Sequence, residues 1–344
     1  MKPKLSILFT ALFTLFVLLC SCTAQRQTEG EYYDDVFFAM DTYVTVRLAR
    51  VGQTEDSLSA VRDECERIVT ELEEILTSHS PNGEVYALNE SGAEIRTVSP
   101  TLAAVLSEAV ELSELTDGAF DFTLGRLTEL WNVTGGGPVP SVRDIEEALS
   151  HVGCESVTVT VVSGEDGGTV SRRDTDVRID LGGVGKGAAA DALIEYLSET
   201  DVSHGLVSVG GTIGVFGEKP NGEPYLIGIR SPEDAGEVIG YLRVYDGFVS
   251  VSGDYERYFE EKGVRYHHIL DRATGRPADS GLCETAVYAE RGAVADALST
   301  ALFVMGRDRS FELYERGDIA FEAVLVSTDG AVTATDGAEL EPLE

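Results

Sequence analysis

Basic residues are scarce in this chain. Its 344 residues include 26 lysines and arginines against 60 aspartates and glutamates, which gives a formal net charge of −34. A surface this acidic repels nucleic-acid phosphates and anionic lipid headgroups, so we expect no nucleic-acid partner and no flat adsorption on a membrane. Any bound polyphosphate needs local cationic groups to offset the charge.

Cysteine is scarce as well, and its spacing excludes two kinds of site. Cys20 and Cys22 lie in the N-terminal segment, and the other three are Cys65, Cys154 and Cys283. Three widely spaced cysteines close at most one bridge, and no CxxC pair offers a zinc site. We therefore expect no disulfide framework and no structural zinc, and we expect each of the three to be a small buried residue.

One apolar run begins the chain. Lys2 and Lys4 flank its start, the run extends over residues 5–19, and the sequence then turns polar. It is too short to cross a bilayer comfortably and has the layout of a secretory signal. Its end reads LCSC and resembles a bacterial lipobox, so residues 1–21 are predicted to be a lipoprotein signal peptide and Cys22 the lipid-modified first mature residue. An ordinary signal peptide with two incidental cysteines is the alternative.

The predicted signal sets the expected location and domain organisation. Residues 22–35 are a short polar tether, and residues 36–344 have ample length for a substantial core. We expect the protein to be extracytoplasmic and anchored to the cell membrane through its lipid.

Helical and strand patterns occupy different parts of the chain. Helical periodicity is concentrated early, whereas short β-rich segments bounded by Gly, Pro or Asp predominate from Ser156 onward. The predicted helices cover 55–78, 101–116 and 144–151, and the predicted strands cover 37–48, 156–162, 177–181, 206–209, 225–229, 238–244, 248–251 and 285–289. This distribution predicts an α+β fold with mixed or antiparallel sheets.

A polar stripe interrupts an otherwise apolar helix near the C-terminus. Residues 293–305 read AVADALSTALFVM, and only Asp296, Ser299 and Thr300 are polar, on one side of the helix. No lysine or arginine lies in this segment, and burying an unpaired carboxylate is costly. A hard cation on the oxygens of Asp296 and Thr300 would satisfy it. The alternative is a hydrogen bond from backbone or water of a neighbouring segment.

A glycine-rich segment, VRIDLGGVGKGA at 177–188, predicts a strand, a turn and a helix that runs to about Ser198. Such a turn presents backbone N–H groups to an anion, and Lys186 adds a cation where a phosphate would lie. It is not a Walker A loop, because Asp180 and Gly187 occupy two of the required positions. It meets the loose GxGxxA pattern of dinucleotide-binding folds, but the next strand ends in Gly-Gly without the expected acid. Close packing of helix and strand also explains the glycines.

Two adjacent histidines provide another candidate. The segment YHHILDRATGRP at 266–277 carries His267 and His268 on a β segment that breaks at a turn. Neighbouring strand residues face opposite sides, so at most one histidine can point into a given site. A histidine of near-neutral pKa can accept a proton from an attacking hydroxyl. Taken alone, the pattern favours a structural histidine.

Seven blocks between about Phe37 and Glu315 carry a combined signature. They are AMDTYVTVRL from Ala39, DGAFDFTLGRLTELW from Asp117, DLGGVGKGAAAD from Asp180, SVGGTIGVFGEKPNGEPYLIGIRSP from Ser208, VSGDYERYF from Val251, YHHILD from Tyr266 and ADALSTALFVMG from Ala295. Their order and spacing resemble the FAD:protein FMN transferase family, the ApbE-type flavin transferases. The resemblance implies one large ApbE-like α+β domain.

The resemblance also implies a magnesium-dependent reaction. FAD would be split at its pyrophosphate, FMN joined by a phosphoester to a Thr or Ser hydroxyl of a partner protein, and AMP released. The implied Mg²⁺ ligands are Asp296, Thr300 and a backbone carbonyl matching Gly183, and the implied base is His268. The implied flavin contacts are Met40, Ala119, Phe120, Asp121, Asp180, Lys186 and Leu270. The implied acceptor belongs to a membrane redox protein, or is a domain of one.

Some positions depart from the family pattern. His79 stands where an aromatic residue, usually tyrosine, stacks near the flavin, and His79 can still stack or hydrogen-bond there. Phe122 and Arg272 stand where proline is common, and Thr212 stands where an amide or acid is frequent. None of these changes touches the implied metal ligands.

Two other functions stay open at this point. With water in place of the protein hydroxyl, the same site would be an FAD pyrophosphatase that yields FMN and AMP. A noncatalytic lipoprotein that stores FAD would bind it with or without Mg²⁺ and release no AMP.

Overall fold

The computed structural model describes residues 31–162, 167–231 and 237–342. The predicted signal peptide, Cys22 and most of the 22–35 tether therefore lie outside the described residues. Within the described ranges, no helix combines the length and the apolar character needed to span a bilayer.

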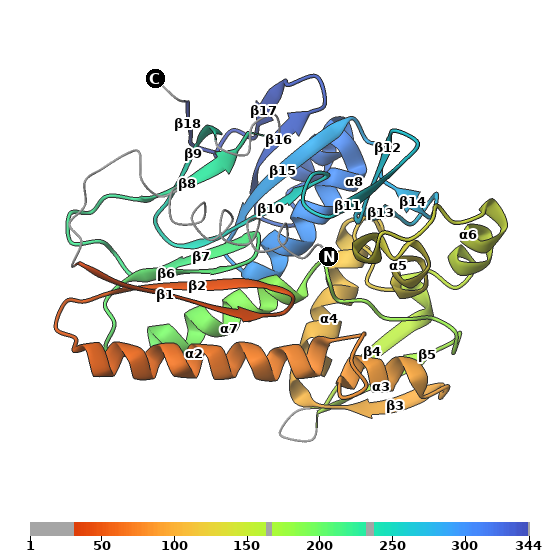
Figure 1. Cartoon of the computed structure of the whole chain (residues 1–344), viewed down its shortest axis with the longest axis horizontal. Coiled ribbons are helices and arrows are strands. Elements are labelled where there is room, and N and C mark those ends of the chain that lie inside the picture. Colours follow the sequence, from red (N-terminus) through yellow and green to blue (C-terminus); the bar gives the residue numbers. More distant parts are fainter. Residues whose placement is uncertain (1–30, 163–166, 232–236, 343–344) are drawn as a thin grey trace, which may run out of the picture.

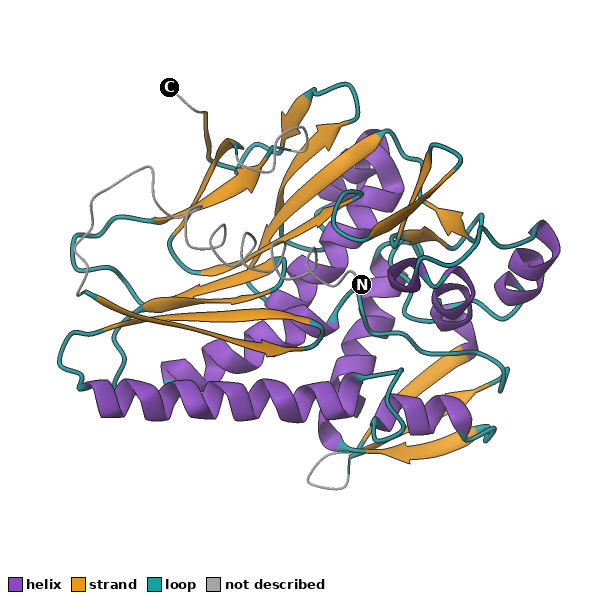
Figure 2. Cartoon of the chain, in the orientation of Figure 1, coloured by secondary structure: helices purple, strands orange, loops and turns teal. Residues whose placement is uncertain are grey.

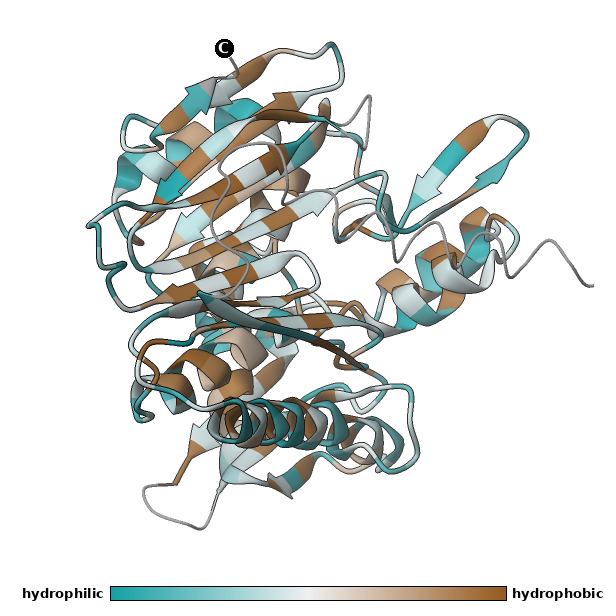
Figure 3. Ribbon diagram, turned by 60° about the vertical axis from the view of Figure 1, so that its left-hand side comes forward, coloured by the Kyte–Doolittle hydropathy of each residue, from teal (hydrophilic) through white to brown (hydrophobic). Residues whose placement is uncertain are grey.

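A central antiparallel sheet organises the molecule (Figure 1). In spatial order its strands are β1 (Tyr32–Ala39), β2 (Thr42–Ala49), β6 (Gly205–Val209), β7 (Thr212–Phe216), β10 (Gly247–Gly253), β15 (Leu282–Ala289), β16 (Glu322–Ser327) and β17 (Val332–Ala334). Buried and less buried residues alternate along several of these strands, and Figure 3 shows the same alternation in hydropathy. Period-2 alternation of this kind buries one face of a sheet against a core.

Helices cover one face of the sheet, as Figure 2 shows. The helices in the described residues are α2 (Glu55–Leu76), α3 (Glu84–Glu90), α4 (Pro100–Leu115), α5 (Gly125–Trp131), α6 (Val142–Leu149), α7 (Gly185–Ser198) and α8 (Gly292–Arg316), with short 3₁₀ turns η1 (Val133–Gly135) and η2 (Cys154–Ser156). Of these, α2, α7 and α8 contact the central sheet. Thr54 and Ser57 form a capping box at the start of α2, and Ser99 caps α4 just before a proline at its first position. These signals explain why the predicted helices are confirmed to within a few residues.

Smaller sheets complete the fold. A sheet of β8 (Tyr225–Arg230), β9 (Val238–Val244) and β18 (Leu340–Pro342) packs through Ile227, Ile229 and Leu242 against the central sheet, on apolar residues that include Val249. The other small elements are the sheet of β3 (Ile95–Val98), β5 (Gly168–Arg172) and β4 (Val157–Val161), the hairpin of β11 (Tyr258–Glu261) and β12 (Val264–His267), and the hairpin of β13 (Leu270–Asp271) and β14 (Arg276–Pro277). The result is a mixed α+β single domain with antiparallel sheets, as predicted.

Two predicted strands are wrong. The 37–48 segment is a hairpin, because Met40 and Asp41 have φ of 53° and 55° and reverse the chain between β1 and β2. The 177–181 segment is extended but is not a sheet strand: Asn89 binds both the N–H and the carbonyl of Ile179 at 2.8 Å. Its alternating apolar pattern reflects burial alone.

The predicted burial of the three cysteines in the described residues is confirmed. Cys65, Cys154 and Cys283 are free and buried. Burial raises the pKa of the Cys65 thiol to about 12, so it is inert at neutral pH.

Candidate functional site

The N-termini of α7 and α8 meet at a contact between two glycines. A Cβ on Gly187 would lie 2.1 Å from the carbonyl oxygen of Gly292, and one on Gly292 would lie 2.5 Å from that of Gly187. Only glycine fits at either position. Asp191 of α7 strengthens the junction, because its carboxylate accepts the N–H groups of Gly292 (2.6 Å) and Ala293 (2.9 Å) and so caps α8 from outside.

This junction holds Asp296, which is only 2% exposed. Its Oδ2 accepts the Gly187 N–H at 3.0 Å, and its Oδ1 lies 3.3 Å from Ser250 Oγ and 3.4 Å from Lys186 Nζ. The sequence analysis looked for a cation only within the helix that carries Asp296. In the structure the cationic partner of Asp296 is Lys186, which belongs to α7. The alternative interpretation of a backbone hydrogen bond from a neighbouring segment is also present, at Gly187.

Thr300 and Gly183 lie beside this carboxylate. Thr300 is one helical turn after Asp296, and its Oγ1 would be 3.5 Å from a Cβ on Gly183. Ser299 turns elsewhere, to Ser252 Oγ at 2.7 Å. A carboxylate, a hydroxyl and the backbone of the glycine loop therefore converge, and such oxygen donors suit a hard divalent cation.

Lys186 extends along the glycine loop from the first turn of α7. Its Nζ donates to the carbonyl oxygen of Gly182 at 3.1 Å while remaining 3.4 Å from Asp296 Oδ1. The loop is itself turned by Asp180, whose Oδ1 accepts the Gly182 N–H at 2.9 Å. A helix N-terminus with a lysine on its first turn attracts a phosphate group.

His268 follows β12 and lies in a strongly basic environment. Its backbone N–H donates to the carbonyl oxygen of Arg257 at 3.0 Å, and its Nδ1 lies 3.2 Å from the same oxygen. Burial, Lys186 and Arg257 lower the pKa of His268 to about 4. The ring is therefore neutral at physiological pH, and with Nδ1–H donating to the carbonyl, Nε2 is left as a proton acceptor.

The two histidines do face opposite ways, as predicted. His267 is 7% exposed, and its Nε2 lies 3.0 Å from the carbonyl oxygen of Ala278. Its ring meets that of Phe303 edge to face, with centroids 5.4 Å apart. His267 is thus a core residue, and the geometry leaves His268 as the candidate base.

The β1–β2 turn reaches the start of α7. The Met40 methyl would lie 3.6 Å from a Cβ on Gly185, so the thioether covers the first residue of the helix. Arg257 Nη2 donates to the carbonyl oxygen of Asp41 at 3.1 Å and so links this turn to the His268 segment. Met40 therefore lies at the start of the helix that carries Lys186, and Arg257 connects the neighbouring turn residue to His268.

The predicted flavin contacts after α4 are buried. Phe120 lies against the glycine loop, 3.2 Å from where a Cβ on Gly183 would be, and Ala119 is 7% exposed. The Asp121 carboxylate accepts Thr123 N–H (2.8 Å), Thr123 Oγ1–H (2.5 Å) and Arg272 Nη1–H (2.9 Å). Asp121 thus fixes the loop that carries Phe120, and its predicted flavin contact stays a prediction.

Two further predicted flavin contacts stand apart from the Asp296 junction. Leu270 is buried in an apolar cluster with Trp131 and Leu127. His79 is exposed beyond α2, and no hydrogen bond within the described residues joins its side chain to Lys186 or His268. Their proposed flavin contacts stay predictions.

The sequence analysis did not identify several buried polar residues that the structure brings to notice. Thr212 and Arg272 stood out only as departures from a family pattern, yet Thr212 Oγ1 binds Ser250 Oγ at 2.9 Å behind Asp296. It also missed Glu284, which is fully buried and accepts a hydrogen bond from the Tyr255 hydroxyl. Burial raises the pKa of Glu284 to about 7. Its position in a β-rich segment gave no sign of this.

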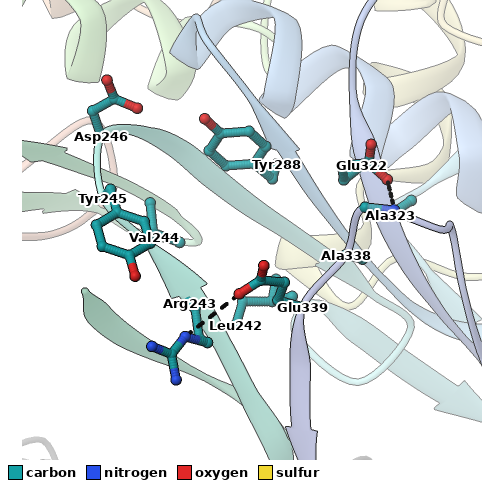
Figure 4. Close-up of a pocket in the computed structure, with 11 residues that line it drawn as sticks. Leu242, Arg243, Val244, Tyr245, Asp246, Tyr288, Glu322, Ala323, Ala338 and Glu339 are labelled. Carbon is teal, nitrogen blue, oxygen red and sulfur yellow. Dashed lines mark hydrogen bonds and ion pairs between the residues drawn. The ribbon is translucent and has the colours of Figure 1, made fainter. Parts of the chain in front are cut away.

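A cavity elsewhere in the molecule is shown in Figure 4. It has a volume of about 200 Å³ and lies where β9 approaches β15, β16 and the segment before β18. Tyr245 and Tyr288 line it, and Arg243 pairs with Glu339 at 3.5 Å on its rim. None of the predicted site residues lines this cavity.

Known proteins match the chain over most of its length. The family model described as the ApbE family matches residues 40–325. The curated FAD:protein FMN transferase of Vibrio cholerae is 31% identical over 299 residues, which is 85% of this chain and 86% of that protein. That of Treponema pallidum is 30% identical over 351 residues, which is 97% of this chain and 95% of that protein.

Solved structures agree. The crystal structure of the ApbE protein from Thermotoga maritima matches with a TM-score of 0.80 and 34% identity, covering 89% of this chain and 97% of that chain. Flavin transferase ApbE from Vibrio cholerae matches with a TM-score of 0.77 and 26% identity over the same shares. The glycine loop, the α7–α8 junction and these matches lead to one conclusion: the chain belongs to the ApbE family and is an enzyme of the FAD:protein FMN transferase class.

Proposed function

We propose that this flavin transferase uses Mg²⁺ to move FMN from FAD to a threonine or serine hydroxyl of a partner protein, with release of AMP. The convergence of Asp296, Thr300 and the Gly183 backbone beside Lys186 carries the proposal. Asp296 and Thr300, together with the Gly183 carbonyl, would hold the metal ion. When bound, Mg²⁺ supplies positive charge against the negative charge of the diphosphate.

The chain's own residues position the substrate. The glycine loop and the N-terminus of α7 would face the diphosphate, and Lys186 is long enough to reach its oxygens. Met40 covers the start of the same helix, so an isoalloxazine ring placed against its thioether would keep the diphosphate over the loop. Positioning of this kind accounts for most of the catalysis in phosphoryl transfer.

His268 completes the proposed reaction. The acceptor hydroxyl oxygen attacks the phosphorus on the FMN side, and its proton passes to His268 Nε2. The bond from that phosphorus to the bridging oxygen breaks, and this oxygen leaves as part of AMP. Because the pKa of His268 is about 4, its neutral form is present throughout the physiological pH range.

The proposed location rests on the predicted lipobox, and the proposed partner rests on the family resemblance. A lipid on Cys22 would hold the enzyme at the extracytoplasmic face of a membrane, and the tether would be shorter than the predicted 22–35, because Tyr32 already begins β1. The proposed acceptor is therefore a membrane redox protein, or a domain of one, that presents its hydroxyl at the same face.

A direct assay tests the proposal. Residues 23–344 are incubated with FAD, Mg²⁺ and a threonine-bearing acceptor domain, and acceptor mass and AMP are followed together. We expect one FMN unit on the acceptor for each AMP, and no product when Mg²⁺ is chelated. An acceptor in which the threonine is replaced by valine is the matched control.

Two other results would replace this function with another. AMP and FMN without acceptor labelling, across several acceptors, would indicate the FAD pyrophosphatase. FAD binding without AMP, whether or not Mg²⁺ is added, would indicate an FAD-storage protein.

A further inference from the structure

We propose that Lys186 is an internal counter-ion of Asp296 that competes with the divalent cation for this carboxylate. When a diphosphate binds, Lys186 moves toward it and leaves Asp296 to the cation. The inference rests on the proposed function, because it takes Asp296 as a metal ligand and a diphosphate as substrate. Its consequence is that the protein binds the cation weakly until FAD is present.

The contacts of the ammonium group carry the inference. Lys186 Nζ lies 3.4 Å from Asp296 Oδ1 and donates to the Gly182 carbonyl oxygen at 3.1 Å. A carboxylate of α8 and a carbonyl of the glycine loop are the same kinds of oxygen that a hard cation needs. Lys186 therefore already offsets the charge of a side chain that is only 3% exposed.

The path of the Lys186 side chain directs its ammonium group toward Asp296. Lys186 bends back four residues to the Gly182 carbonyl, and its Cδ would be 3.2 Å from a Cβ on Gly210 in the β6–β7 turn. A larger residue at 210 would displace the lysine stem. The β6–β7 turn thus steers the ammonium toward Asp296.

The Lys186 side chain can also move away from Asp296. It is 28% exposed, its stem is flexible, and an ammonium has three donors of which these two contacts use two. The negative charge of a diphosphate at the α7 N-terminus would draw Lys186 outward. Two cations sharing Asp296 repel each other, so a metal ion binds more tightly once Lys186 has moved.

By thermodynamic linkage, the proposed competition can be measured as a coupling between FAD affinity and cation affinity. If Lys186 couples the two ligands, FAD raises the affinity for the cation and the cation raises the affinity for FAD by the same factor. Removing the lysine should raise cation affinity in the absence of FAD and weaken the coupling.

The test is a Mn²⁺ titration of the full-length chain without FAD, with free Mn²⁺ followed by electron paramagnetic resonance. We expect Lys186→Met to bind Mn²⁺ about tenfold more tightly than the wild type, within the usual range of coupling between sites. Lys186→Arg keeps the charge and should bind as weakly as the wild type. Lys186→Gln serves as a second neutral variant if the methionine variant does not fold.

Two controls separate direct competition from general charge effects. Lys262→Met removes an exposed lysine on the β11–β12 hairpin, and Arg257→Met removes a cation beside His268 that has no contact with Asp296. Both should stay within about twofold of the wild type if competition is direct. An unchanged or weaker Mn²⁺ affinity in both neutral Lys186 variants, or an equal gain in Arg257→Met, would overturn the inference.

Parallel measurement of FMN transfer distinguishes this inference from the proposed function. FMN transfer by the wild-type chain, together with unchanged Mn²⁺ affinity in the neutral Lys186 variants, refutes the competition and leaves the function standing. Tighter Mn²⁺ binding in the neutral Lys186 variants, together with a wild-type chain that transfers no FMN, supports the competition and refutes the function.

Discussion

Two buried aspartates, Asp121 and Asp296, are each paired with a cation but are bonded very differently. The Asp121–Arg272 pair is 2.9 Å long, and Thr123 adds two bonds of 2.5 and 2.8 Å to the same carboxylate. The Asp296–Lys186 pair is 3.4 Å long, and the other contacts of Asp296 are 3.0 and 3.3 Å. Both carboxylates have almost no exposure.

The difference fits a structural role for Asp121 and the ligand-binding role proposed for Asp296. Both oxygens of Asp121 already accept short hydrogen bonds from Thr123 and Arg272, so its carboxylate is firmly held within the protein. Asp296 accepts an ordinary hydrogen bond from the Gly187 N–H at 3.0 Å, but its contacts with Ser250 and Lys186, at 3.3 and 3.4 Å, are long enough for a better partner to replace. Asp121 and Asp296 are almost equally buried, so burial does not distinguish them. The lengths of their hydrogen bonds and ion pairs do.

The largest expected effect is on catalysis, from Asp296→Asn. The amide keeps the shape and can still accept the Gly187 N–H, but it loses the charge that a metal ligand needs. We expect AMP release to fall by roughly 1,000-fold, because a bound metal ion contributes several kcal/mol. The free energy of unfolding should change by less than about 1 kcal/mol. Wild-type AMP release by the Asp296→Asn enzyme would contradict the proposed metal-binding role of Asp296.

Arg272→Met should instead affect stability. It leaves the buried Asp121 carboxylate without its cation, which costs about 3 kcal/mol in the free energy of unfolding. Urea denaturation measures the loss, and the further change Asp121→Asn in the same chain should restore part of it. Arg307→Met, which breaks an exposed pair with Asp308, is the matched control and should cost less than about 0.5 kcal/mol. Equal losses in the two arginine variants would contradict the structural role of Asp121.

Glu284 extends the comparison to a buried carboxylate with a hydroxyl partner. Its pKa is about 7 in the folded protein against an ordinary value of 4.5, so the folded state holds the extra proton between those pH values. Stability therefore falls as pH rises through this window, by about 3 kcal/mol. Glu284→Gln cannot ionise, so its melting temperature should match the wild type near pH 5 and exceed it near pH 8. A pH-independent difference would show that the carboxyl does not titrate there.

The smallest expected effect is that of Ser250→Ala. Ser250 connects Asp296 Oδ1 to Thr212, and orienting groups of this kind are worth about tenfold in metal affinity. Mn²⁺ titration with FAD present measures it. Ser299→Ala is the matched control, because Ser299 is equally buried but its hydroxyl binds Ser252 and the Asp296 backbone, away from the carboxylate. A larger loss in the Ser299 variant would contradict the role of Ser250.

Local signals account for the parts of the fold that could be predicted. The caps at Thr54 and Ser99 and the alternation in β9 are readable because they depend on neighbouring residues. The two strand errors depend on other information. Met40 adopts a left-handed conformation that its residue type disfavours, and the partner of Ile179 is 90 residues away.

The site shows the same limit. The stripe of Asp296 and Thr300 could be read from one helix, because an acid in an apolar helix needs a partner wherever it folds. The identity of that partner could not, since Gly187 is 109 residues from Asp296 along the chain, and Arg272 is 151 residues from Asp121. The assignment of His268 over His267 came from a family resemblance, and the structure supplies its physical basis in the Arg257 carbonyl.

The contact between Gly187 and Gly292 has a consequence for folding kinetics. It joins two helix starts that are far apart in sequence, so a large loop must close before the site exists. A metal ion at the proposed site would therefore have no assembled ligand set in the early folding chain, unlike the short metal-binding loops of zinc fingers. Added cation should leave the refolding rate nearly unchanged and slow unfolding instead, because its binding energy is gained only after the two helices have met.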